Sequence, residues 1–235
     1  MIRAILFDKD GTLTDFRATW EAWMPETIYA LARASGADPA EIAESYGYDL
    51  QGGRIAADGL FVTATGDTVA QAVGKRIGWP ADRLAAWLAP RQAAVEQVAV
   101  PGLADLLRRL KRAGLALGVL TNADAAEAQA QLTRLKLAPH LDRVIGCDSG
   151  YGAKPDPAGA AAFADELGLE RETVVLVGDG LTDMAAARGA GLRAVAVLTG
   201  TLDRTRLAEH AEAVLPDVTH LPQWLTTQGV PIPET

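Results

Sequence analysis

Five short runs of apolar residues stand out along the chain, and each has the length of a buried β-strand. Four of them follow one another from residue 115 onward, separated by stretches whose apolar residues recur at helical spacing. This alternation predicts an α/β fold with a doubly wound parallel sheet, covered by helices on both faces. The predicted strands are residues 2–7, 115–120, 143–147, 173–177 and 193–197.

The segments between the later strands carry helix start and stop signals. Residues 102–113 place four leucines on one stripe, with Pro101 near the start and Gly114 just past the end. Two further helices are predicted at residues 124–135, which open on a candidate capping aspartate, and at residues 156–168. We expect these helices to connect the parallel strands.

The stretch between the first two predicted strands breaks this alternation. Successive helical patterns without intervening buried strands occur at residues 20–34, 39–46, 65–77 and 81–98. Four of the five tryptophans also lie in this stretch, which favours a small module with its own aromatic core: Trp20, Trp23, Trp79 and Trp87. We therefore predict an inserted helical domain of residues 16–98 and an α/β core domain of residues 1–15 and 99–235.

The composition, with 49% hydrophobic and 22% charged residues among 235, is that of a globular protein. A net charge of −8 argues against general affinity for nucleic acid or anionic membranes. Cys147 is the single cysteine, so neither an intrachain disulfide nor a thiolate zinc site is expected. Neither a signal peptide nor an apolar run of about 18 residues is found, which predicts a cytoplasmic protein without membrane contact.

Two carboxylates follow directly after the first predicted strand, in the stretch Asp8-Lys9-Asp10-Gly11-Thr12. Ligands of parallel sheets bind at the carboxyl ends of the strands, so this position favours a functional role. On an extended backbone Asp8 and Asp10 point the same way, and we expect Lys9 to point elsewhere and not to neutralise them. The stretch is also a good turn sequence, so a purely structural interpretation stays open.

A second acidic pair follows the fourth predicted strand. Asp179 and Asp183 lie about one helical turn apart, so both carboxylates are able to face one point at the same sheet edge. Helix capping and a favourable helix-dipole interaction are the structural alternatives, but a cap accounts for one acid and not for four. Four converging carboxylates would recruit a cation, and an all-oxygen site suits Mg²⁺. The histidines are scattered, which disfavours zinc: His140, His210 and His220.

Two other strand ends supply groups that a phosphate would need. Thr121 and Asn122 follow the second predicted strand, where a hydroxyl and the first backbone amides of a helix are available. Lys154 follows the third strand and is well placed to bring a positive charge to the carboxylates. Singly, Thr121 reads as a helix cap and Lys154 as a surface lysine. Their positions after successive strands favour function.

Together these stretches resemble the four motifs of the haloacid dehalogenase superfamily of phosphohydrolases, in order and after successive strands. The matching stretches are DKDGT at 8–12, TN at 121–122, KP at 154–155 and GDGLTD at 178–183. The resemblance covers the sheet domain almost end to end and implies a Rossmann-like core. The insert resembles, in architecture only, the helical cap of phosphoglycolate-phosphatase-like members.

The resemblance implies a Mg²⁺-dependent phosphatase that hydrolyses a small phosphomonoester, by default 2-phosphoglycolate, through an aspartyl-phosphate intermediate. Asp8 would be the nucleophile, and Asp10 would act as general acid and then as general base. Thr121, Asn122 and Lys154 would hold the phosphate, with Thr121 and Lys154 also assisting catalysis.

The resemblance also implies the metal ligands, which would be Asp8, the main-chain carbonyl of Asp10, Asp179 and Asp183. For Asp183, direct ligation, ligation through water and orientation of Lys154 all stay open. Lys9 replaces the usual apolar residue between the two acids, as in P-type ATPases. Those lack the second acid and span membranes, so Asp10 favours a phosphatase. Gly180 stands where serine is more frequent, which puts one supporting hydrogen bond in doubt and not the metal.

The insert would act as a lid that excludes water and contacts the leaving part of the substrate. Trp20 and Arg54 are its candidate substrate contacts, with core packing and a solvated surface position as their competing interpretations. Two alternatives to a phosphatase stay open: a phosphosugar mutase of the same fold, and a non-catalytic Mg²⁺-dependent phospho-acceptor or binding module. Asp10 argues against the second, because a stable acyl-phosphate needs no hydrolytic base. We expect a monomer or homodimer whose partner is a small phosphomonoester.

Overall fold

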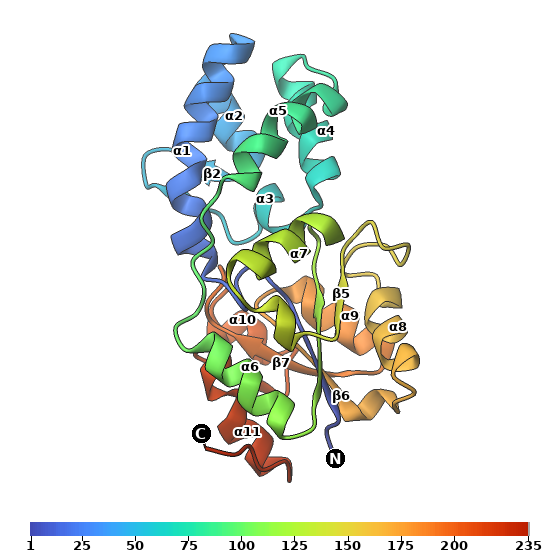
Figure 1. Cartoon of the computed structure of the whole chain (residues 1–235). Helices are drawn as coiled ribbons and strands as arrows, with labels where there is room; N and C mark the ends of the chain where they lie inside the picture. Colours follow the sequence, from blue (N-terminus) through green and yellow to red (C-terminus); the bar gives the residue numbers. More distant parts are fainter. Residues whose placement is uncertain (235) are drawn as a thin grey trace. The chain divides into compact units, whose positions relative to one another are not determined.

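The computed structural model describes residues 1–234, which form two compact units (Figure 1). One unit combines residues 1–15 with the chain from residue 99 onward, and the other consists of residues 16–98. The first unit is therefore interrupted by the second directly after its first strand and the acidic stretch that follows it.

The first unit is built on a six-stranded parallel sheet in the order β5-β4-β1-β6-β7-β8. This confirms the predicted α/β class with a doubly wound sheet. Because the chain adds β4 and β5 on one side of β1 and then β6 to β8 on the other, the carboxyl end of β1 lies at the topological switch point, where such sheets bind ligands. The strands are β1 (Ala4–Phe7), β4 (Ala116–Leu120), β5 (Arg143–Ile145), β6 (Val174–Gly178), β7 (Arg193–Val197) and β8 (Ala213–Leu215).

Successive residues of each central strand enter two different apolar layers. In β1, Ile5 and Phe7 belong to one buried cluster, whereas Ala4 and Leu6 belong to the other. Both faces are covered by helices, so no strand position has to be polar, and this explains the continuous apolar runs. One face packs against α6 (Leu103–Arg112), α7 (Ala125–Arg134) and α11 (Leu221–Thr227), and the opposite face against α8 (Ala158–Glu166), α9 (Leu181–Ala190) and α10 (Arg204–Ala208).

The helix signals read from the sequence give the right helices with small shifts at their ends. The leucine stripe of α6 is buried as predicted, at Leu103, Leu106, Leu107 and Leu110. The candidate cap of α7 works differently: Asp124 makes no capping hydrogen bond, and the carboxylate of Asp148 accepts from the Ala125 amide instead, at 2.8 Å.

The second unit is mainly helical and has its own core. The buried face of α1 contributes Trp20, Met24, Ile28 and Leu31, which repeat at helical spacing and pack with residues of α2, α4 and α5. The helices are α1 (Phe16–Ser35), α2 (Pro39–Tyr46), α3 (Leu60–Thr63), α4 (Gly66–Ile77) and α5 (Ala81–Ala93). Trp23, Trp79 and Trp87 only border this cluster, so the core is more aliphatic than predicted.

Two features of the second unit differ from the sequence expectation. A two-stranded antiparallel hairpin, β2 (Tyr48–Asp49) with β3 (Arg54–Ile55), interrupts the helices; its strands are too short to show a period of two. Helix α5 ends at Ala93 and not at Val98. The Val98 amide donates to the Thr19 hydroxyl at 3.1 Å, so the last residues leave the helix while their backbone stays hydrogen-bonded.

Within residues 1–234, no helix combines the length and the apolar character that crossing a bilayer requires.

Candidate active site

The ends of β1, β4 and β6 bring functional side chains to one edge of the sheet. The backbone of Asp8 extends β1 by one residue, because its amide donates to the Val177 carbonyl of β6 at 2.8 Å. The Thr121 amide likewise donates to the Ile145 carbonyl of β5 at 2.9 Å. The first residue beyond each of these two strands is thus still held by the sheet.

Three carboxylates converge at this edge. Asp8, Asp179 and Asp183 each offer an oxygen, and these oxygens all lie within 4.8 Å of one another. The three residues are only 6%, 6% and 2% exposed. The cluster joins the residue that follows β1, the loop after β6 and the first turn of α9, and it contains three of the four acids that were predicted to converge.

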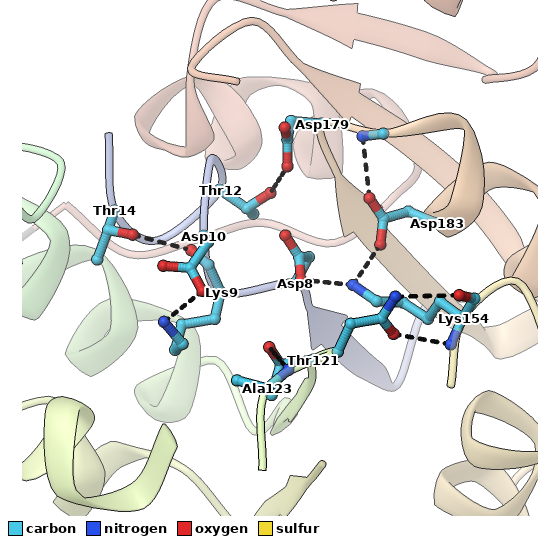
Figure 2. Close-up of polar contacts among 12 residues, drawn as sticks. Asp8, Lys9, Asp10, Thr12, Thr14, Thr121, Ala123, Lys154, Asp179 and Asp183 are labelled. Carbon is cyan, nitrogen blue, oxygen red and sulfur yellow. Dashed lines mark hydrogen bonds and ion pairs between the residues drawn. The ribbon is translucent and has the colours of Figure 1, made fainter. Parts of the chain in front are cut away.

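Lys154 supplies the positive charge. Its ammonium lies 2.5 Å from Asp8 Oδ1 and 2.6 Å from Asp183 Oδ1, so it bridges the two carboxylates (Figure 2). Burial alone would lower the pKa of Lys154, but the charges of Asp183 and Asp8 and the hydrogen bonds to them outweigh burial and raise it. Lys154 is therefore a buried, charged residue and not a surface lysine. The peptide bond that follows it, to Pro155, is cis.

One ammonium does not compensate three carboxylates, and the pKa values of Asp8 and Asp179 reflect this. Burial raises the pKa of Asp8 from 3.8 to about 6; Lys154 opposes the shift, and the charges of Asp183 and Asp10 add to it. Burial together with the charges of Asp8 and Asp183 raises the pKa of Asp179 well above its ordinary value. The cluster carries an excess of negative charge that a bound cation would relieve.

Asp179 is held between two glycine backbones. A Cβ atom on Gly200 would lie 1.7 Å from Asp179 Oδ2, and a Cβ on Gly11 would lie 2.4 Å from the same oxygen. The Thr12 hydroxyl donates to Asp179 Oδ1 at 3.3 Å, and the Thr199 hydroxyl donates to the Gly11 carbonyl at 2.7 Å. Sequence reasoning missed Gly200, although its place shortly after the fifth predicted strand was a signal that could have found it.

Asp183 performs two tasks at the start of α9. Its Oδ2 accepts the Gly180 amide at 2.9 Å, and its Oδ1 accepts from Lys154. The first contact supports the start of the helix through the backbone, whatever side chain stands at position 180. The second contact favours a role for Asp183 in orienting Lys154, and ligation of a metal by Asp183 stays a prediction.

Thr121 and Asn122 lie on the loop between β4 and α7. The Thr121 hydroxyl accepts the Ala123 amide at 3.2 Å, so this residue shapes the loop and does not cap α7, whose N-cap is Asp124. The Asn122 side chain makes two hydrogen bonds with the backbone of Lys154: it accepts from the amide at 2.8 Å and donates to the carbonyl at 3.0 Å. Asn122 thereby fixes the loop that carries Lys154.

The expectation for Lys9 is wrong. The Lys9 ammonium lies 2.5 Å from Asp10 Oδ2, and the two side chains face one another (Figure 2). Alternation of side chains holds within a regular strand, but β1 ends at Phe7. Beyond it the chain turns, with the Leu13 and Thr14 amides donating to the Lys9 carbonyl. The lysine side chain is long enough to reach the carboxylate of the neighbouring Asp10.

Asp10 contributes differently from the other three acids. Its carboxylate is not part of the three-residue cluster but is paired with Lys9, and its side chain is 22% exposed. A ligand role for its main-chain carbonyl, and an acid-base role for its carboxylate, stay predictions.

The two candidates in the insert lie within the second unit. Trp20 is 6% exposed and packs edge-to-face on Trp23 and Phe61, which gives it a role in the core. The Arg54 side chain is 65% exposed and lies 3.6 Å from Glu21 Oε2. Their roles as substrate contacts stay predictions.

The family follows from a direct comparison. A family model described as "Hydrolase: haloacid dehalogenase-like hydrolase" matches residues 2–191. The chain therefore belongs to the haloacid dehalogenase-like hydrolases, as the order of its four motifs predicted.

Individual relatives carry more specific names. A phosphoglycolate phosphatase of Rhodospirillum rubrum is 38% identical over 133 residues, which span 57% of this chain and about half (54%) of that protein. An N-acetylmuramic acid 6-phosphate phosphatase of Pseudomonas aeruginosa is 30% identical over 85% of this chain and 83% of that protein. Among solved structures, a "predicted phosphoglycolate phosphatase" of Haemophilus somnus shares the fold, with a TM-score of 0.73 at 19% identity, over 95% of this chain and 98% of that one.

The acidic cluster fits a divalent cation. Its donors are all carboxylate oxygens, they are close enough to share one ion, and their negative charge exceeds that of the single lysine. Hard cations such as Mg²⁺ and Ca²⁺ prefer such oxygen ligands, whereas the cluster offers no histidine or cysteine for zinc.

Proposed function

We propose that the protein is a Mg²⁺-dependent phosphatase that hydrolyses a small phosphomonoester through an aspartyl-phosphate. The observation that carries the proposal is the position of Asp8: a buried carboxylate at the end of the central strand, bridged by Lys154 to Asp183 and within reach of a shared cation. Membership of a hydrolase family supports it. Asp8, Asp179 and Asp183, with the carbonyl of Asp10, would hold Mg²⁺, which would neutralise phosphate charge.

In the first half of the reaction, Asp8 would attack phosphorus and displace the alcohol. Lys154 would keep Asp8 oriented and neutralise charge on the phosphoryl oxygens, together with the Thr121 hydroxyl and the backbone amides of the same loop. The Asn122 side chain would act indirectly, because both of its polar ends are bonded to the Lys154 backbone. Asp10 would donate a proton to the leaving oxygen.

In the second half, Asp10 would take a proton from water as the water attacks the phosphoryl group and Asp8 leaves. The two halves need the same carboxylate first as an acid and then as a base, so Asp10 must reach the substrate side of the phosphorus. The Asp10 side chain is 22% exposed, against 9% for the Asp8 side chain, which is in keeping with that position.

The substrate class is small phosphomonoesters, with 2-phosphoglycolate as the first candidate. The relatives are named for two different substrates, a phosphorylated two-carbon acid and a phosphorylated amino sugar acid. The identity of the substrate is therefore best tested with both compounds and a wider panel.

The experiment measures phosphate release from phosphorylated metabolites with Mg²⁺ and with excess EDTA. We expect release that stops when EDTA is added. Isomer formation without phosphate release would indicate a phosphosugar mutase, and a stable phosphoprotein without turnover would indicate a phospho-acceptor module. Undiminished phosphatase activity in EDTA would contradict the metal.

A further inference from the structure

Lys9 is a charged side chain buried where the chemistry proposed above needs no further cation. It is 1% exposed, and its ammonium lies 2.5 Å from Oδ2 of Asp10. Within residues 1–234 this contact is an ion pair, and the Lys9 ammonium makes no hydrogen bond of normal geometry. No ion pair joins it to Asp8 or Asp183, the two carboxylates that Lys154 bridges (Figure 2). Lys9 and Lys154 thus act on different acids of the same site.

The backbone of Lys9 is held rigidly by the turn that follows it. Its carbonyl accepts the amides of Leu13 at 2.9 Å, Thr14 at 3.1 Å and Thr12 at 3.3 Å, and also the Thr14 hydroxyl at 3.3 Å. The turn that bonds to this carbonyl also carries Asp10. The ammonium and the carboxylate are therefore presented to one another by one compact segment, 9–14.

A neutral side chain would fill this space at lower cost. Removing an ammonium from water costs several kcal/mol, and replacing a buried ion pair by apolar groups is often neutral or stabilising. The half-buried Glu127 on α7, which accepts from Gln131 at 2.8 Å, lies in the field of both charges: burial raises the pKa of Glu127, Lys9 lowers it and Asp10 raises it. Packing alone thus gives no reason for a cation at position 9.

We propose that Lys9 is a positioning residue for proton transfer, which holds the carboxylate of Asp10 in place through their ion pair. This inference rests on the proposed function. In the first step the Asp8 oxygen forms a bond to phosphorus, the bond from phosphorus to the leaving oxygen breaks, and that oxygen takes its proton from Asp10. In the second step the oxygen of a water molecule forms a bond to phosphorus, the bond between Asp8 and phosphorus breaks, and the water gives a proton back to Asp10.

The test compares two aryl phosphates that differ in the leaving group. Phenolate is a poor leaving group that needs the proton, whereas p-nitrophenolate leaves without it. In single-turnover measurements with Mg²⁺, Lys9→Met should slow release of phenol from phenyl phosphate about 10- to 100-fold, the size expected when a proton donor is misplaced. Release of p-nitrophenol should fall by less than about 3-fold, and KM should stay unchanged for both.

Thermal unfolding provides the second readout. Lys9→Met removes a buried charge while keeping the length of the side chain, so the Tm should stay equal or rise. The matched control is Lys111→Met, which breaks an exposed lysine–aspartate pair of 2.7 Å with Asp142 and should leave both rates unchanged. Lys9→Gln, whose amide is still able to donate to Asp10, should recover part of the phenyl phosphate rate and covers the case in which Lys9→Met does not fold.

Wild-type rates in Lys9→Met, or equal losses on the two substrates, would overturn the role of Lys9. If the wild-type protein releases phosphate and Asp10→Asn does not, either result leaves the proposed phosphatase intact. If the wild-type protein hydrolyses no phosphomonoester, the proposed function itself fails.

Discussion

The two units of the molecule differ in whether they bury charged side chains. The charged residues that are buried in the described part of the chain all belong to the sheet-based unit: Asp8, Lys9, Lys154, Asp179 and Asp183. In residues 16–98 every aspartate, glutamate, lysine and arginine is at least partly exposed, and the core there is apolar. Burying charges opposes folding, so the unit that does so has another reason for keeping them. Buried charge therefore marks the chemistry.

The strongest way to break this comparison is to remove charges one at a time, two in the sheet-based unit and one in the insert. Asp8→Asn should reduce turnover to background, and Asp10→Asn should reduce it about 10²- to 10⁴-fold, the usual contribution of a general acid or base. Glu44→Gln, which removes an exposed partner of Arg76 in the insert, should change turnover by less than about 2-fold. Steady-state phosphate release measures all three.

Circular dichroism of the same variants separates chemistry from folding, and we expect all of them to be folded. Substantial activity in Asp8→Asn would remove the nucleophile assignment. A large loss in Glu44→Gln would show that exposed charge in the insert matters as much as buried charge in the sheet unit.

Adding one methyl group to a glycine in each unit, by Gly200→Ala and Gly66→Ala, extends the comparison. Gly200→Ala would place a Cβ 1.7 Å from Asp179 Oδ2, so the carboxylate must shift. We expect Mg²⁺ affinity and turnover to fall about 10- to 100-fold, the range found when a group that orients a metal ligand is changed. In the insert, Gly66 begins α4 with no atom within 4 Å of an added Cβ. Gly66→Ala should keep full activity and stabilise by up to about 1 kcal/mol.

Titration of activity with Mg²⁺ measures the effect of Gly200→Ala, and urea unfolding measures the effect of Gly66→Ala. Unchanged Mg²⁺ dependence in Gly200→Ala would mean that Asp179 is free to adopt another position.

The buried acids also predict how stability depends on pH. The pKa of Asp8 rises from 3.8 to about 6 on folding, so the folded protein binds this proton more tightly and is favoured at low pH. As pH rises through 6 this contribution is lost. Between pH 5 and pH 8 the metal-free protein should lose about 1 kcal/mol of unfolding free energy from Asp8, and Asp179 acts in the same direction.

Urea unfolding in EDTA at the two pH values measures this loss, and the difference between wild type and Asp8→Asn isolates it from other groups. Mg²⁺ at pH 8 should restore stability to the wild-type protein. A metal-free protein that is more stable at pH 8 than at pH 5, relative to Asp8→Asn, would contradict the sign.

The smallest expected effect concerns Arg54. A clamp on a substrate carboxylate would make Arg54→Ala raise KM for 2-phosphoglycolate far more than for p-nitrophenyl phosphate. The side chain is largely exposed and lies beside Glu21, so we expect changes of less than about 2-fold for both substrates. A selective rise in KM for the acidic substrate would support the clamp.

Most of the sheet could be predicted because a parallel strand covered on both faces must be apolar throughout. That rule identified β1, β4, β5, β6 and β7, and with them the positions of the acids that follow β1 and β6. It missed β8, a half-buried strand at the edge of the sheet, because its apolar run of three residues is too short to stand out in the sequence. The same reason explains why the short hairpin of the insert was not anticipated.

The sequence predicted most of the charged and hydroxyl side chains of the site, because their chemistry is visible from residue type and position after the strands. Lys9 was misplaced because strand alternation was extended past Phe7, where the chain already turns. Gly200 was missed because a glycine acts here only by lacking a side chain, and one sequence does not show which glycines have neighbours. The contact of Asn122 with the Lys154 backbone was not anticipated, because it depends on two loops meeting in space, and the phosphate-binding role of Asn122 stays a prediction.

The central place of β1 has a consequence for the order in which the molecule is able to assemble. Its partners β4 and β6 begin at residues 116 and 174, so the first strand to emerge from a ribosome must wait for most of the chain before both of its edges are paired. Contacts this distant in sequence slow folding. A nascent chain therefore exposes an unpaired, wholly apolar strand for much of its synthesis. The yield of folded protein would then depend on how well that segment is shielded from aggregation.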